Sequence, residues 1–335
     1  MRSGARRAAL KWPTWSYRVL LPLLSVGITL AVGEGLCRLF GWGAERPAGF
    51  RFYVRNIDGD VEETYNREDP DLMWSPAPGV HDAGLYRVSP EGFRGALPPG
   101  SGPLVACLGD SSTFGVDTPE PQTWPRVLSS RLPAGARVLN AGVTGYTVVQ
   151  AAARYQRDVR ALRPAVVVLY VGINDPVARF WLSDSQVLER RVPPEVAALE
   201  ASWLLQLQLY RALRALVADE LDGRPPVPRV AAAEFSVALE ALAHQVAADG
   251  GRLIVLVPPV DPTRSHGWPR LPEIEHYKER LRRVAGARVV EPRLSPGAGF
   301  IDIVHPSPLG HRELAAALAP EVSVALGGAK GRSAE

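Results

Sequence analysis

The chain has 335 residues, of which 46% are hydrophobic, and its formal net charge is +3. The basic excess precedes the first acidic residue, Glu34, and consists of Arg2, Arg6, Arg7, Lys11 and Arg18. Without these five residues the net charge is about −2, which excludes the basic surface of a nucleic-acid-binding domain. The two cysteines, Cys37 and Cys107, are too few for a disulfide framework.

An apolar segment follows the basic tail of residues 1–18. Residues 19–33 carry no charge, and the apolar character continues to Trp42. About 20 residues cross a bilayer, so we predict a transmembrane signal-anchor over residues 19–41. The preceding basic residues place the tail in the cytoplasm and the rest of the chain outside it, in the periplasm or at the cell surface. Two alternatives stay open: a signal peptide cleaved near Ala31-Val-Gly33, and a buried core helix.

Residues 42–100 are rich in proline, glycine and charge. We expect an extended, membrane-proximal segment that packs on the main domain. Within it, Leu85–Arg94 alternates apolar and polar residues, as a short strand before a turn does. The run Pro98-Pro-Gly-Ser-Gly-Pro103 marks a domain boundary, because proline and glycine interrupt regular structure.

Residues 101–327 alternate apolar runs with helical patterns. The apolar runs are Leu104–Gly109, Arg137–Ala141, Ala165–Val171, Leu253–Pro258 and Arg288–Glu291. The helical patterns are Trp124–Leu132, Val148–Leu162, Ala231–Ala248, Ile274–Val284 and Leu309–Ala325. Strands made almost wholly of Val, Ile and Leu are buried on both faces. The pattern therefore predicts an α/β domain in which helices cover a parallel sheet.

One connection, residues 176–228, is too long for a plain loop and is interpreted as an insertion. Its centre, Pro194–Leu221, has a helical apolar stripe that includes Trp203 and Leu216. The stripe either packs on the domain or belongs to a lid. A third interpretation is a helix on the membrane surface that turns Arg211 and Arg214 toward lipid headgroups.

The first strand ends in Gly109-Asp-Ser111, where the carboxyl ends of parallel strands build sites. A serine hydroxyl becomes a nucleophile when a base accepts its proton and a third group orients that base. Asp302 and His305, three residues apart before Pro306, are suited to the roles of orienter and base. Capping the next helix is the structural alternative for Ser111, and Ser112 is the rival nucleophile.

Acyl transfer also requires hydrogen-bond donors for the developing oxyanion. The ends of two further strands offer donors: Gly142 in Asn140-Ala-Gly142, and the side chain of Asn174 in Gly172-Ile-Asn174-Asp175. Glycine and asparagine also end strands without any chemical role. It is the three turns together with Asp302 and His305 that form a specific set.

This set resembles the four sequence blocks of the SGNH (GDSL-type) hydrolase superfamily over about residues 101–327. The resemblance implies a flavodoxin-like three-layer α/β/α sandwich with a parallel sheet of about five strands. It assigns Ser111 as nucleophile, His305 as base and Asp302 as its orienter, with the backbone N–H groups of Ser111 and Gly142 and the Asn174 side chain as oxyanion hole. It requires no cofactor and no metal. The anchor is similar to that of bacterial members associated with envelope polysaccharide.

The combined interpretation is a membrane-anchored serine esterase that forms an acyl-enzyme. The expected substrate is a small acyl ester, acetyl above all, on an envelope carbohydrate. Three alternatives remain: an O-acyltransferase on envelope polysaccharide, a lipase or thioesterase acting on lipid, and an envelope scaffold or binding protein without activity. Asp110 is expected to stabilise its turn, and His311 to be structural.

Overall fold

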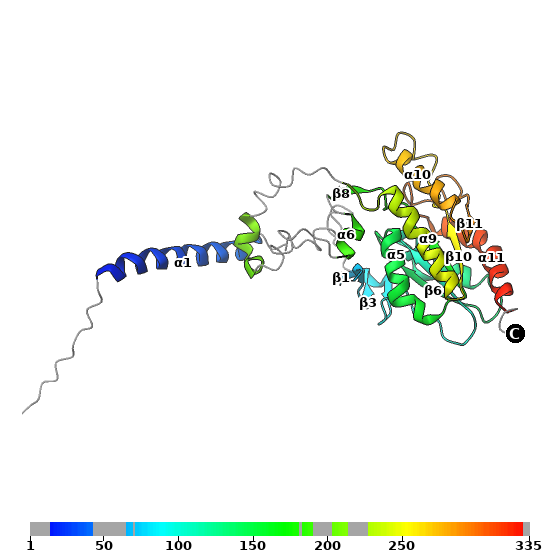
Figure 1. Ribbon diagram of the computed structural model, residues 1–335, viewed down its shortest axis with the longest axis horizontal. Helices are drawn as coiled ribbons and strands as arrows, with labels where there is room; N and C mark the ends of the chain where they lie inside the picture. The colour runs from blue at the N-terminus through cyan, green and yellow to red at the C-terminus, as the bar shows by residue number, and fades with distance from the viewer. Residues whose placement is uncertain are drawn as a thin grey trace, which may run out of the picture. The chain divides into compact units, whose positions relative to one another are not determined.

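The computed structural model describes residues 14–42, 65–69, 71–180, 183–189, 203–213 and 227–330. They divide into two units (Figure 1). The first unit takes in Met1–Phe52 and Pro193–Gly223, and the second takes in Tyr53–Val192 and Arg224–Glu335. The insertion predicted from the sequence is therefore shared between the two units.

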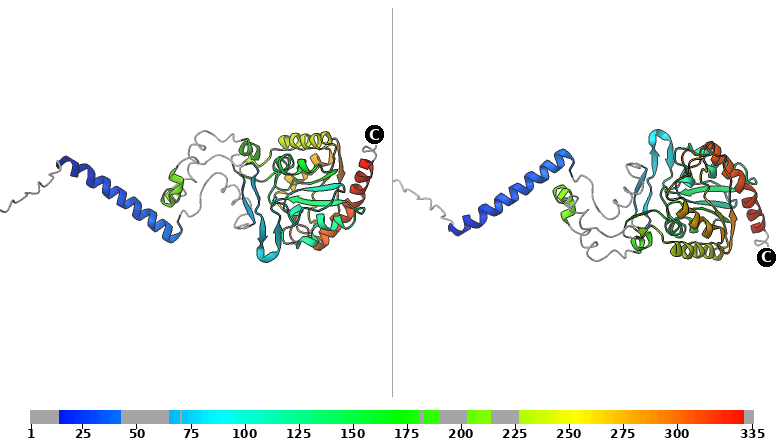
Figure 2. Two further views of the ribbon diagram at one scale, coloured as in Figure 1. Left: turned by 90° about the horizontal axis from the view of Figure 1, so that it is seen from below. Right: turned by 90° about the horizontal axis from the view of Figure 1, so that it is seen from above.

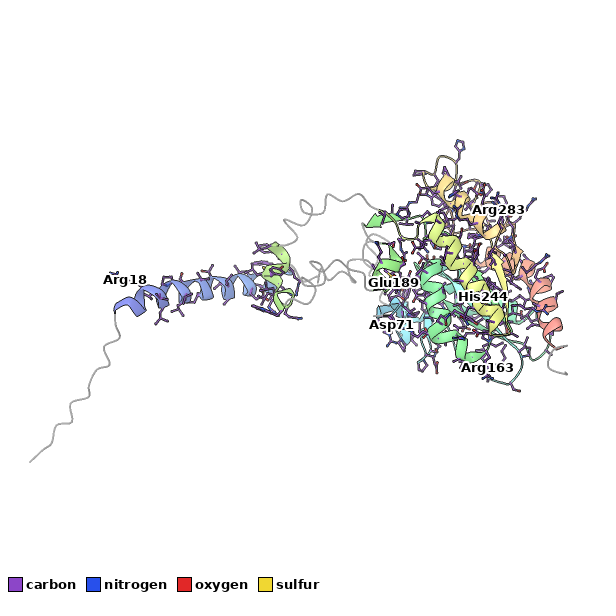
Figure 3. All side chains as sticks on the ribbon, in the orientation of Figure 1. Arg18, Asp71, Arg163, Glu189, His244 and Arg283 are labelled. Carbon is purple, nitrogen blue, oxygen red and sulfur yellow. The ribbon has the colours of Figure 1, made fainter. Side chains whose placement is uncertain are left out.

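The first unit is built on α1 (Thr14–Phe40), a helix of 27 residues. At 1.5 Å per residue it is about 40 Å long, which exceeds the hydrocarbon thickness of a bilayer, about 30 Å. Its stretch Arg18–Phe40 is long and apolar enough to cross a membrane. Every side chain from Arg18 to Val32 is exposed, so in this part of the helix the apolar surface has no protein cover (Figure 3).

The second unit is organised around a parallel sheet of five strands in the order β11-β10-β7-β5-β6. The strands are β5 (Leu104–Gly109), β6 (Arg137–Gly142), β7 (Val166–Tyr170), β10 (Arg252–Leu256) and β11 (Ala287–Val290). Counted along the chain, this is the doubly wound 2-1-3-4-5 arrangement of flavodoxin-like folds. The predicted fold class is confirmed.

Helices cover both faces of this sheet, because successive strand residues point to opposite faces. Ala106 and Leu108 of β5 pack with α5 (Val148–Arg154), α9 (Ala232–Ala248) and α10 (Leu271–Arg282). Val105 and Cys107 pack with α4 (Trp124–Ser129) and α11 (Pro308–Lys330). Figure 2 shows the sheet between these two layers.

Several helices differ from the sequence prediction: α4 ends at Ser129 instead of Leu132, and α11 ends at Lys330 instead of Ala325. The pattern Val148–Leu162 is regular only as far as Arg154; it continues as a π-helical turn, Tyr155–Val159, and a 3-10 turn, Arg160–Leu162. Helix α10 begins at Leu271, three residues before the expected start, because proline at its second position suits the first turn of a helix.

Short hairpins precede the sheet. They pair β1 (Asn66–Asp69) with β2 (Met73–Pro76), and β3 (Gly79–His81) with β4 (Tyr86–Val88). Trp74 Nε1 donates to the carbonyl of Thr144 at 2.9 Å, and the Tyr146 hydroxyl donates to the carbonyl of Trp74 at 2.6 Å. The first hairpin thus holds the loop that follows β6.

The insertion leaves and rejoins the second unit at one place. Strands β8 (Ala178–Phe180) and β9 (Val227–Pro228) pair in antiparallel. The buried Arg229 guanidinium donates to both carboxylate oxygens of Asp184, on α6 (Asp184–Leu188), at 3.1 and 2.7 Å. Of the predicted central helix, the structure describes a 3-10 turn, Trp203–Gln206, and a helix over 208–213; residues 190–202 and 214–226 lie outside the described part of the chain.

The sheet order reverses direction between β5 and β7, since β6 lies on one side of β5 and β7, β10 and β11 on the other. In an open α/β sheet, ligands bind in the crevice at the carboxyl ends of the strands that flank such a switch point. Gly109 pairs with Tyr170 at this end of the two strands. The residues that follow Gly109 and Tyr170 therefore occupy the expected position of the site.

Candidate active site

Ser111 stands on a tight turn at the end of β5. Gly109 has φ +154°, and a Cβ there would lie 2.3 Å from the Tyr170 carbonyl oxygen and 2.4 Å from Thr113 Oγ1, so only glycine fits. Asp110 then caps the short helix α3 (Ser111–Phe114) by accepting the Ser112 N–H at 2.9 Å. The Ser111 side chain remains partly exposed, whereas Ser112 is 2% exposed.

His305 and Asp302 reach this serine from a loop 194 residues further along the chain. Ser111 Oγ lies 2.8 Å from His305 Nε2, and His305 Nδ1 lies 2.6 Å from Asp302 Oδ2. The loop is closed by the Ile301 N–H, which donates to the carbonyl of His305 at 2.9 Å. The structure therefore brings together the three residues that the sequence predicted as nucleophile, base and orienter.

The charge on Asp302 fixes the proton positions in this chain of contacts. Burial opposes its ionisation, but hydrogen bonds and charge attraction from His305 outweigh that cost and lower the pKa of Asp302 to about 2. A carboxylate only accepts hydrogen bonds, so Nδ1 carries the proton and donates to it. In neutral imidazole, Nε2 is then the acceptor for the Ser111 hydroxyl.

The predicted oxyanion donors lie at the ends of β5, β6 and β7. The Ser111 N–H has no acceptor among the described residues. Asn174 donates one amide hydrogen to the Tyr146 carbonyl at 3.1 Å and keeps its second. The Gly142 N–H donates to Asn140 Oδ1 at 3.0 Å, so it is already engaged.

A second glycine of the same turn, Gly145, differs in this respect. Its N–H has no acceptor in the described part of the chain, and its φ of +71° belongs to the left-handed region. It directly precedes Tyr146, whose carbonyl is held by Asn174. Gly145 was not among the donors predicted from the sequence, although the glycine pair Gly142-Val-Thr-Gly145 was the signal for it.

Comparison with known proteins identifies the site's family. The profile of the GDSL-like lipase/acylhydrolase family matches residues 107–313, which is well over half of the chain. The chain belongs to this GDSL family. The match confirms the resemblance to SGNH hydrolases, and it makes the protein an ester hydrolase.

Solved structures and a curated relative accompany this match. Axe2, an acetylxylan esterase from Geobacillus stearothermophilus, is 21% identical with a TM-score of 0.44 over 67% of this chain and 95% of its own. A putative lipolytic protein of the G-D-S-L family from Desulfitobacterium hafniense is 17% identical with a TM-score of 0.42 over 66% of this chain and 98% of its own. The uncharacterized lipoprotein YqeF of Bacillus subtilis is 34% identical over 76 residues. The match covers 21% of this chain and 31% of YqeF, so the chain spans less than a third of that relative.

A third loop of this GDSL hydrolase supports the Asp302–His305 loop. The Asp261 N–H donates to the Ile303 carbonyl at 2.8 Å, and the Arg264 guanidinium donates to the carbonyl of Ile301. The buried Asp261 carboxylate in turn accepts the N–H groups of Thr263 and Gly297 at 2.9 and 3.2 Å. Sequence reasoning missed Asp261; its signal was an aspartate in the loop that follows β10 at this edge of the sheet.

Two more buried ionisable groups hold the surroundings of the site. Asp175 accepts the N–H groups of Val148 and Gly172, at 2.8 and 3.0 Å, and burial raises its pKa to about 7. His311 accepts the Trp124 N–H through Nδ1 at 3.1 Å, and burial lowers its pKa to about 3. Asp175 and His311 are both buried, so neither group is open to a substrate. Among the described residues, no group of three His, Cys, Asp or Glu side chains is arranged to hold a metal ion.

Proposed function

We propose that this GDSL hydrolase acts through an acyl-enzyme formed on Ser111. The 2.8 Å contact between Ser111 Oγ and His305 Nε2, with Asp302 behind the imidazole, is the observation that carries the proposal. Ser111 Oγ bonds to the ester carbonyl carbon while its proton passes to Nε2. Collapse of the tetrahedral intermediate breaks the ester C–O bond, and Nε2 returns the proton to the leaving alcohol. Water then repeats the sequence and releases the acid.

The oxyanion of the tetrahedral intermediate requires donors that are free in the resting enzyme. The Ser111 N–H and the second amide hydrogen of Asn174 meet this requirement. Gly142 was the expected third donor, but its N–H must first leave Asn140 Oδ1. The Gly145 N–H lies in the same turn and has no acceptor among the described residues, which supports its assignment as the third donor.

The proposed substrate is an acetyl ester on an envelope carbohydrate. The length and exposed apolar surface of α1 support a retained membrane anchor. Arg2, Arg6, Arg7, Lys11 and Arg18 precede its apolar core and favour a cytoplasmic N-terminus. The hydrolase domain then lies outside the cytoplasm, where envelope polysaccharides carry ester groups within its reach.

A matched serine pair tests the mechanism. Full-length protein in detergent is assayed on p-nitrophenyl acetate, butyrate and octanoate beside Ser111→Ala and Ser112→Ala. Loss of the nucleophile lowers kcat by about 10⁴-fold or more, whereas Ser112→Ala keeps the turn, because its backbone N–H still reaches Asp110. Activity retained in Ser111→Ala contradicts the assignment.

The ester series tests the substrate class. Turnover that falls from acetate to octanoate supports a small acyl group, and the reverse trend favours a lipid ester. A folded wild-type protein that consumes ester only when an oligosaccharide is added, and acylates it, is a transferase. If a folded protein consumes no ester either with or without the oligosaccharide, the result favours the envelope scaffold or binding protein.

A further inference from the structure

The first unit contains a contact that the hydrolase reaction does not explain. Glu34 lies within the apolar helix α1, yet both of its carboxylate oxygens are occupied. Oε1 accepts the Gln208 N–H at 3.1 Å, and Oε2 accepts the Leu209 N–H at 2.8 Å. Arg38, one turn further along α1, donates to Oε1 at 2.8 Å. The two backbone donors open the helix 208–213, whose first N–H groups have no acceptor within the helix itself.

Small residues of α1 lie beside the Glu34 carboxylate, where residues 203–213 pack on the helix. A Cβ on Gly33 would lie 3.0 Å from Leu209 Cδ2, so the leucine packs directly on the α1 backbone. Cys37 follows one turn later on the same face. It is 3% exposed, whereas Leu39, on another face, is 75% exposed. Gly33, Glu34 and Cys37 therefore form a docking face on α1 for the segment 203–213.

Large apolar side chains of the same unit point away from this contact. Trp203 is 71% exposed and Leu213 is 54% exposed. At the end of α1, the exposed rings of Phe40 and Trp42 stack with centroids 5.3 Å apart. Like most apolar side chains of α1, these side chains are exposed among the described residues. Tryptophan is enriched where a bilayer meets water, so a lipid surface fits this patch better than water does.

We propose that residues 203–213 are the second part of a two-part membrane anchor. They dock on the face formed by Gly33, Glu34 and Cys37, and they lie in the bilayer interface with Trp203 and Leu213 in lipid. The inference rests on the membrane-spanning role proposed for α1. A carboxylate in an apolar helix is costly in lipid, and the docked backbone N–H groups together with Arg38 offset that cost. The helix that carries the docking face stays in the mature protein, and the middle of the insertion attaches to the membrane instead of closing over the site.

Cys37 provides the test, because docking protects its thiol. The full chain in phosphatidylcholine vesicles is treated with N-ethylmaleimide, and modified peptides are quantified by mass spectrometry. Glu34→Ala removes the acceptor, and Gly33→Leu fills the space of Leu209; each raises the labelling rate of Cys37 by about tenfold. Leu39→Ala, on an exposed face, leaves the rate unchanged. Cys107, fully buried in the sheet, stays unlabelled in every sample and shows that the hydrolase domain is folded.

Equal labelling of Cys37 in the wild type and in Glu34→Ala overturns the docking. A mature chain whose intact mass begins after Gly33 overturns it as well. Ester hydrolysis is measured on the same samples and is unchanged in Glu34→Ala. Because labelling does not depend on turnover, an inactive wild type contradicts the proposed esterase without affecting this inference.

The lipid contact of Trp203 is tested by fluorescence quenching in vesicles of phosphatidylcholine brominated at acyl carbons 6 and 7. Bromine quenches tryptophan at close range, so the quenched fraction is smaller in Trp203→Phe than in the wild type. Equal quenched fractions in the wild type and in Trp203→Phe overturn the lipid contact of Trp203, and the exposed face is then a contact surface for another protein.

Discussion

The Asp302 carboxylate holds His305 at two points. Oδ2 lies 2.6 Å from the imidazole Nδ1, and Oδ1 accepts the backbone N–H of the same histidine at 2.7 Å. The first contact orients the ring, and the second fixes the backbone that carries it. Asp302 thereby sets both the tautomer and the position of the proposed base.

Asp302→Asn separates these two functions. The asparagine oxygen keeps the backbone contact, but its amide group faces Nδ1 and favours the tautomer in which Nε2 carries the proton. We expect kcat/KM on p-nitrophenyl acetate to fall by about 10³–10⁴-fold, with circular dichroism unchanged. The pKa of Asp302, about 2, lies below the usual 3.8, so the carboxylate stays ionised at pH 4–7. Activity within tenfold of the wild type contradicts the orienting role.

Asp110→Asn is the matched change at a carboxyl outside the proposed proton path. Burial raises the pKa of Asp110 from 3.8 to about 7, so the neutral form is favoured in the fold. The folded state then binds more protons than the unfolded state between these values. The wild type therefore loses stability as pH rises from 4 to 7, by at most about 1.4 kcal/mol per pH unit. Asparagine copies the neutral form and lacks this loss. Urea unfolding at pH 5 and pH 8 measures this loss of stability. If the stability difference between variant and wild type is the same at both pH values, the prediction is wrong.

At His311, the pH dependence of stability has the opposite sign, and His311→Asn tests it. Burial lowers the pKa of His311 from 6.5 to about 3, so the unfolded state binds more protons between these values. Stability is complete above pH 6.5 and falls as the solution is acidified toward pH 3. Asparagine can still accept the Trp124 N–H but does not titrate. Acid unfolding of the variant is expected to be less steep from pH 6 to 4. A parallel decline of the two proteins excludes His311 as the source of acid sensitivity.

Asp261→Ala tests the support of the Asp302–His305 loop. Without the carboxylate, the N–H groups of Thr263 and Gly297 lose their acceptor, and the loop that holds Ile303 relaxes. We expect kcat to fall about tenfold or more while KM changes little, because substrate contacts remain and the base is displaced. Asp261→Asn keeps an acceptor oxygen and recovers most of the rate. Equal losses in both variants, accompanied by reduced thermal stability, identify a purely structural residue.

The strands of the sheet were predictable because each is a short apolar run bounded by turn residues. β5, β6, β7, β10 and β11 all lie within one or two residues of the apolar runs in the sequence. The hairpins β1–β2 and β3–β4 were harder to predict. Their strands are three or four residues long. The first hairpin also has contacts with the loop after β6, such as that of Trp74 with Thr144, which no local pattern encodes.

The sequence also placed Ser111 and Asn174 at strand ends, and Asp302 and His305 on a loop before the last helix. The fold brings Ser111 together with Asp302 and His305. For the third oxyanion donor, the sequence favoured Gly142 over Gly145 in the run Gly142-Val-Thr-Gly145. That choice depends on the Asn140 side chain, which folds back onto the Gly142 N–H, whereas the Gly145 N–H has no acceptor among the described residues. Local side-chain capping of this kind depends on rotamers set by neighbours distant in sequence, here the carbonyl of Thr113, which accepts Asn140 Nδ2 at 2.8 Å.

The shared entry and exit of the insertion has a mechanical consequence. A pull on residues 190–226 reaches the hydrolase domain through β8 and β9, which are paired side by side, and through the ion pair of Arg229 with Asp184. The Asp184 N–H donates to the Arg229 carbonyl at 2.7 Å and joins the two ends directly. A force that draws the two ends of the insertion apart therefore meets these contacts before it reaches β7 or α9.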